Sequence, residues 1–131
     1  MTTLRVVEII GWISLPTVMY GGYSLLGFLG RDQLTPFQVT YFRAGHAHAG
    51  VLLLMSLLYF LFIERTHLAP GVQLAGAVAV IVGVLAQSGG FFLHMGVGQP
   101  GRSSLGTTVT SVGALILVVA IALLVFGLIV A

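Results

Sequence analysis

Four long apolar segments, separated by short polar stretches, occupy most of this 131-residue chain. The hydrocarbon core of a bilayer is about 30 Å thick, and a helix of about 20 residues crosses it. Because lipid cannot hydrogen-bond to the backbone, a single apolar segment inside a membrane must be helical. We therefore predict an all-α, integral membrane four-helix bundle that forms one domain over residues 1–131. The spans are expected at approximately residues 6–29, 43–63, 72–95 and 107–130.

The composition supports lipid as the main solvent of the chain. Only 6% of the residues are charged, against about 25% in soluble domains. The net charge of +2 is small and the five basic residues, all arginine, are scattered, so we expect no nucleic-acid partner. The absence of cysteine excludes disulfides and thiolate metal sites. We expect an integral protein of the bacterial plasma membrane.

The loops between the spans are short and contain glycine or proline, so successive helices should be antiparallel neighbours. An even number of spans brings both termini to one side of the membrane, here called side A, together with the loop after the second span. The loops after the first and third spans lie on side B. Three arginines on side B and two on side A favour neither orientation.

Polar residues gather at the side-B end of all four predicted spans. Intramembrane polar groups are costly and tend to face the bundle interior, so this gathering indicates one shared site. The alternative is that helix ends are simply polar, with serine and threonine bonding to their own backbone. The candidate site residues are His46, His48, His94, Gln87, Arg43 and Arg102.

Helical geometry separates the histidines of the second span. Residues turn by about 100° each in an α-helix, so His46 and His48 should point to nearly opposite faces. With the second helix starting near residue 43, both lie in its first turns. His94, in the last turn of the antiparallel third helix, is then expected at the same depth. One of the two histidines can face His94, and the other must face a different helix or partner.

The third span carries a stripe with the spacing of one helix face, made of Gly83, Gln87, Gly90 and His94. The glycines remove side-chain bulk beside the two polar residues. The resulting groove is suited to a flat ligand or to a neighbouring helix.

The segment Gly45-His46-Ala47-His48-Ala49-Gly50 resembles the His-x-His element in the catalytic subunit of haem–copper oxidases and nitric oxide reductases. In that family the first histidine ligates a high-spin haem and the second a low-spin haem, from opposite faces of one helix. The resemblance covers six residues of the 131. This chain lacks the paired histidines of the family's copper site. The resemblance therefore implies that His46 and His48 serve different partners, and not that the chain is an oxidase.

These observations favour a membrane redox subunit that binds haem b, with His94 and one histidine of the second span as axial ligands. Arg43 and Arg102 would then meet the haem propionates. A quinone held by histidine and Gln87 is a variant of this hypothesis. A transition metal bound by His46, His48 and His94 is a second possibility. The third is a non-catalytic accessory subunit, acting in a homo-oligomer or a larger membrane complex.

His67 and Glu8 are among the ionisable residues that fall outside the predicted site. His67 follows the second span in a side-A loop and is expected to be solvated. Glu8 lies near the side-A interface, where we expect it either to extend to water or to pair with Arg5.

Overall fold

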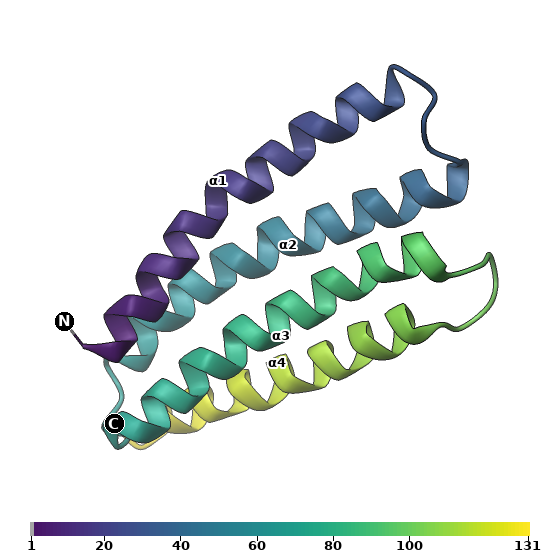
Figure 1. Cartoon of the computed structure of the whole chain (residues 1–131). Helices are drawn as coiled ribbons and strands as arrows, with labels where there is room; N and C mark the ends of the chain where they lie inside the picture. The colour runs from purple at the N-terminus through teal and green to yellow at the C-terminus, as the bar shows by residue number, and fades with distance from the viewer. Residues whose placement is uncertain (1) are drawn as a thin grey trace.

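The computed structural model describes residues 2–131 as four helices joined by short loops (Figure 1). Each helix is long and apolar enough to cross a membrane, and residues 2–131 contain no strand. The predicted all-α architecture with four candidate spans is therefore confirmed, and its apolar surface suits a lipid bilayer. The helices are α1 (Thr3–Leu29), α2 (Pro36–Ile63), α3 (Pro70–Val97) and α4 (Leu105–Ile129).

Helix α2 begins seven residues earlier than the sequence predicted. The Thr35–Pro36 pair, which lies outside the predicted spans, is the start of this helix. Thr35 Oγ1 accepts a hydrogen bond from the Gln38 backbone at 3.3 Å, and the Gln38 side chain accepts one from the Thr35 backbone at 2.9 Å. Proline is well suited to the first helical position, where no backbone N–H is needed. His46 consequently lies three turns into α2, and not in its first turns.

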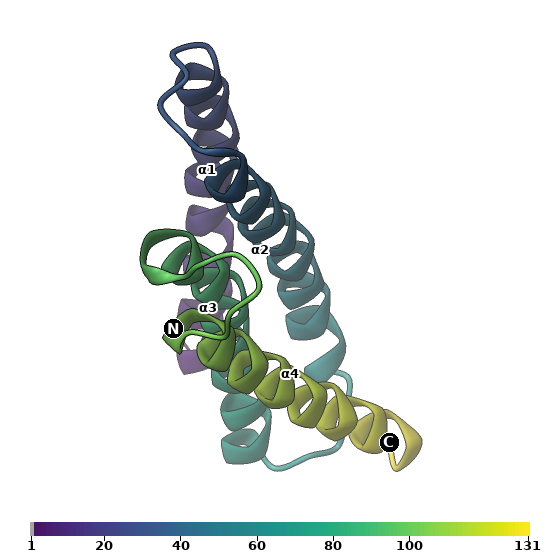
Figure 2. The same ribbon diagram turned by 90° about the vertical axis from the view of Figure 1, so that its right-hand side faces the viewer.

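Helices α3 and α4 form the most extensive contact of the fold (Figure 1). They are closest toward side B and diverge toward side A, where the start of α3 and the end of α4 lie apart (Figure 2). Small residues allow this approach. A Cβ atom on Gly83 would lie 2.7 Å from Leu117 Cγ, and one on Gly90 would collide with the Thr110 side chain and backbone. Close helix approach through small residues is the usual way that membrane helices gain packing energy in lipid.

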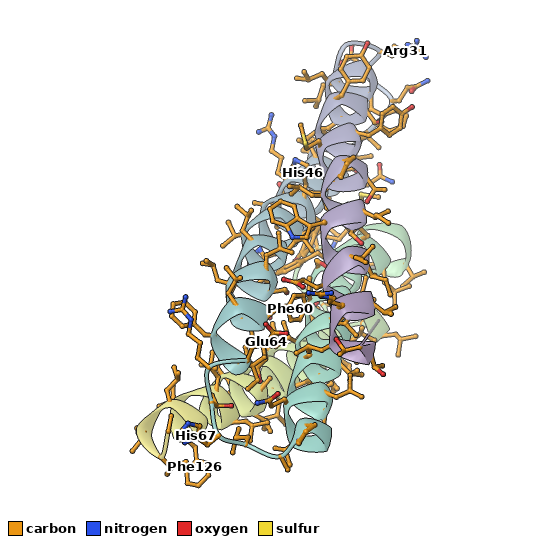
Figure 3. The ribbon with its side chains drawn as sticks, turned by 90° about the vertical axis from the view of Figure 1, so that its left-hand side faces the viewer. Arg31, His46, Phe60, Glu64, His67 and Phe126 are labelled. Carbon is orange, nitrogen blue, oxygen red and sulfur yellow. The ribbon has the colours of Figure 1, made fainter. Side chains whose placement is uncertain are left out.

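The buried core lies toward side A, where α2, α3 and α4 meet. Tyr59 of α2 is 2% exposed and donates a hydrogen bond from its hydroxyl to the Ala120 carbonyl of α4 at 3.1 Å. Phe60, labelled in Figure 3, is also fully buried. The core residues are Leu57, Tyr59, Phe60, Ile63, Ala77, Val80, Val84, Leu117 and Ala120.

Helix α1 is the least buried of the four and diverges from α2 toward side B (Figure 1). Large side chains on it, including Trp12, Tyr20 and Tyr23, are more than half exposed. The two chain termini lie at the same end of the bundle (Figure 1). The bundle is thus a tight α2–α3–α4 unit with α1 resting on its α2 side.

We predict that single cysteines at positions 33 and 99 are labelled from one side of the membrane, and those at positions 2 and 67 from the other. The residues replaced are Gln33, Gln99, Thr2 and His67, and the natural chain has no cysteine that would interfere. Membrane-impermeant maleimide, applied to sealed vesicles and to inverted ones, measures the accessibility. Labelling of positions 2 and 33 from the same side would contradict the four-span topology.

We also predict that Gly90→Val destabilises the bundle while Gly89→Val does not. Gly90 is buried against Thr110 of α4, whereas a Cβ atom on the adjacent Gly89 meets no atom within 4 Å. Overpacking should lower the free energy of unfolding of the Gly90 variant by about 1–3 kcal/mol. Far-UV circular dichroism during a titration with denaturing detergent measures the difference. Equal stability of the two variants would contradict the close α3–α4 contact.

Candidate functional site

His48 has one ring nitrogen fixed by its own helix. Its Nδ1 lies 2.9 Å from the carbonyl oxygen of Ala44, one turn earlier on α2. A carbonyl can only accept, so this hydrogen bond requires a proton on Nδ1. In the neutral ring, Nε2 then carries the lone pair. His48 is therefore prepared to accept a hydrogen bond or to ligate a metal through Nε2.

The His48 ring lines a groove of about 360 Å³ between α2 and α3. Phe91 of α3 packs against the ring, with the two centroids 4.7 Å apart. Val51, also on the groove wall, is 67% exposed, so the groove opens to the lipid side. We call this the His48 groove; it is lined by Ala47, His48, Val51, Leu52 and Gln87.

Gln87 of α3 lines the same groove. Its backbone carbonyl accepts a hydrogen bond from Thr110 Oγ1 of α4 at 3.3 Å. That bond ties the position of Gln87 to the close α3–α4 contact. A carboxamide supplies both donors and an acceptor, so the groove combines one imidazole nitrogen and one amide within an otherwise apolar wall.

His46 points away from the His48 groove and packs on α1 (Figure 3). Its ring lies against Gly21 and Gly22, and a Cβ atom on Gly22 would be 2.8 Å from His46 Nε2. The ring is half-buried in the seam between α1 and α2. His46 and His48 therefore face different helices, α1 and α3, as the helical angle between them predicted.

His94 is enclosed by protein and is only 2% exposed. Its Nδ1 forms a 2.7 Å hydrogen bond with Ser104 Oγ, which also accepts from the Gly106 backbone N–H at 3.0 Å. The rings of Tyr41 and Phe37 pack on it edge to face, with centroid distances of 4.4 and 5.4 Å. His94 therefore joins the end of α3 to the start of α2 and to the N-terminal cap of α4.

The three histidines occupy separate environments. The expected common depth is not found, because α2 begins at Pro36 and places Phe37 and Tyr41, rather than His46 and His48, beside His94. Phe91 contacts both Tyr41 and His48 and so lies between the His94 cluster and the groove. Within residues 2–131, no three His, Cys, Asp or Glu side chains are grouped closely enough to hold one metal ion.

The glycine stripe of the third span is occupied by α4. Gly83 contacts Gly113 and Leu117, and Gly90 contacts Gly106 and Thr110. The sequence analysis suggested either a flat ligand or a neighbouring helix for the groove along this stripe. In the structure a neighbouring helix, α4, occupies it.

The two candidate arginines are exposed near side B and lie outside the His48 groove. Arg43 lies on α2, about one turn closer to the loop than His48. Arg102 lies in the loop between α3 and α4, where its backbone N–H donates to the Gln99 carbonyl at 3.1 Å. Both positions suit contacts with headgroups or with an acidic group at the membrane surface.

The sequence analysis did not identify the hydrogen-bond partners of two histidines. These partners are the Ala44 carbonyl for His48 and the Ser104 hydroxyl for His94. Both carried a signal. Ala44 precedes His48 by four residues, the spacing at which a helical carbonyl faces a side chain. Ser104 precedes Thr107 by three residues, and the pair forms a capping box at the start of α4.

No protein-family model, curated protein or solved structure matches the chain.

We predict that His94 contributes stability through Ser104. His94→Ala removes a buried ring and leaves the half-buried Ser104 hydroxyl without its imidazole partner, which should lower the free energy of unfolding by about 1–3 kcal/mol. Denaturing-detergent titrations of His94→Ala, Ser104→Ala and the double variant measure the coupling between the two side chains. The exposed His67, in the loop after α2, provides the control variant His67→Ala. If His94→Ala is no less stable than His67→Ala, the hydrogen bond between His94 and Ser104 does not stabilise the bundle.

Proposed function

We propose that the protein is a membrane redox subunit that binds a quinone or quinol head group in the His48 groove. The observation that carries the proposal is the hydrogen bond from His48 Nδ1 to the Ala44 carbonyl, which leaves Nε2 as an acceptor on the wall of a groove open to lipid. Two further features support it. Gln87 lines the same groove. The volume of the groove, about 360 Å³, falls within the range of small-molecule sites.

The chemistry follows from the donors and acceptors of the two side chains. His48 Nε2 accepts the hydrogen of a quinol hydroxyl and is positioned to take that proton. The Ala44 carbonyl would stabilise the resulting imidazolium through the Nδ1–H. Gln87 donates from its carboxamide to a ring oxygen. Ala47, Val51 and Leu52 surround the ring with apolar surface, and the isoprenoid tail remains in lipid.

Electrons from a bound quinol require an acceptor outside this groove. We propose a homo-oligomer or a larger complex of the bacterial plasma membrane as the setting, with the redox partner on another subunit. The exposed apolar face of α1 supports such packing, because α1 is the helix least buried within the chain.

Haem b is the second candidate for the same groove. The hydrogen bond of His48 suits a haem ligand. A histidine that ligates haem normally donates its second N–H to a carbonyl or carboxylate, and His48 donates its Nδ1–H to the Ala44 carbonyl. His48 Nε2 would be the ligand. His94 does not fit as the other ligand, because it is enclosed by Tyr41, Phe37 and Ser104. His48 is the one histidine on the groove wall that would hold the haem.

We predict that His48→Ala removes the bound cofactor while His67→Ala retains it. The loss of one hydrogen bond to the head group, about 1.4 kcal/mol, corresponds to about tenfold in affinity. Protein purified in mild detergent is extracted with organic solvent for quinone analysis, and its absorption spectrum is recorded for haem.

The pattern across the variants distinguishes the two candidates. Extractable quinone that falls in both His48→Ala and Gln87→Leu supports the quinone site. A haem spectrum lost in His48→Ala but retained in Gln87→Leu supports the haem site. His94→Ala, refolded to the same helical content, should keep the cofactor in either case. A wild-type protein with neither cofactor would favour the accessory-subunit function.

A further inference from the structure

A second groove, on the α1–α2 side of the molecule, combines an acidic side chain with an apolar wall. It has a volume of about 390 Å³ and is separate from the His48 groove, with which it shares no residue. We call it the Glu8 groove; it is lined by Glu8, Trp12, Leu54, Leu57, Leu58 and Leu61.

Glu8 is the only one of the chain's three acidic residues inside a helical span away from its end. Asp32 lies in the α1–α2 loop, and Glu64 is the residue that ends α2. Glu8 is the sixth residue of α1, so it lies about 7–8 Å along the helix axis from the first residue. A helix of 27 residues is about 40 Å long and extends about 5 Å beyond each face of the hydrocarbon core. The carboxylate therefore lies near the edge of the hydrocarbon at side A.

The remaining walls become apolar with depth. Trp12 lies one turn deeper than Glu8 on the same face of α1 and is 58% exposed, so its ring is open to contact. The four leucines of α2 form the opposite wall. The groove thus offers a negative charge at its rim, an aromatic face next to it and aliphatic surface below.

We propose that the Glu8 groove binds an amphipathic organic cation. A carboxylate at the rim attracts positive charge, and an indole face attracts a cation through its electron-rich surface. The leucine wall takes up an alkyl or aryl body by burial of apolar surface. An acidic residue within a membrane span is costly and commonly marks a ligand or ion pathway.

Other ligand classes fit this groove less well. A divalent metal ion needs several oxygen ligands, and Glu8 is the only acidic side chain on the groove wall. An uncharged lipid tail would pack on the leucines and would make no favourable contact with the Glu8 carboxylate. The combination of one charge and an apolar wall selects a monovalent cation with an apolar body.

The test uses tetraphenylphosphonium as the probe and Trp12, the only tryptophan of the chain, as the reporter. Titration into protein in an uncharged detergent should change the Trp12 emission in a saturable way, and equilibrium dialysis against empty micelles should confirm binding. Glu8→Gln should weaken binding at least tenfold. Glu8→Asp, which keeps the charge, should retain part of it. Glu64→Gln, which removes an exposed acid elsewhere on side A, should bind as wild type does.

A neutral probe of similar shape, triphenylphosphine oxide, separates charge recognition from general apolar binding. Weak binding of the neutral probe, together with loss of cation binding in Glu8→Gln of unchanged helical content, supports the site. Equal binding of the two probes, or of the cation by wild type and Glu8→Gln, would overturn it. These results are independent of the His48 groove, because quinone or haem content is measured separately and should be unchanged in Glu8→Gln.

Discussion

Lipid offers no hydrogen bonds, and this constraint governs both the backbone and the polar side chains of the chain. Every span must satisfy its own amides, and so each is a continuous helix. The hydroxyl groups inside the spans follow the same rule: Ser14, Ser56 and Ser88 each donate to the carbonyl four residues earlier. The His48 Nδ1–H does likewise. Satisfying this polar group locally is what leaves the other nitrogen of the ring available to a ligand.

Small residues decide where the helices come close and where they remain apart. Gly83 and Gly90 allow α4 to press against α3, and the Thr110 bond to the Gln87 carbonyl fixes their register. That contact uses the face of α3 that would otherwise be free for a flat ligand. The His48 groove and the Glu8 groove lie instead beside α2, the first against α3 and the second against the loosely packed α1.

The two proposed sites differ in the kind of chemistry that their residues supply. The His48 groove has an imidazole nitrogen and an amide, which exchange hydrogen bonds and protons with an uncharged redox ring. The Glu8 groove has a carboxylate beside an aromatic ring, which recognises positive charge. Both grooves open to lipid, so both are accessible to ligands that partition into the membrane.

The sequence by itself determined the helical class, the number of spans and the divergence of His46 from His48, because segment length, hydropathy and helical angle are local properties. The sequence analysis placed His48 and Gln87 at the side-B end of the bundle, whereas both lie near the middle of their helices, because α2 begins at Pro36 and α3 ends at Val97. It could not determine which faces of the helices meet. The partner of His94 is Ser104, ten residues away across a loop, and the partner of His46 is the glycine pair of α1. The predicted start of the second span at residue 43 left out the Thr35–Pro36 cap, and this shifted the expected depth of His46 and His48 against α3. Only the tertiary structure settled these points, because helix rotation and register follow from side-chain packing between segments distant in the chain.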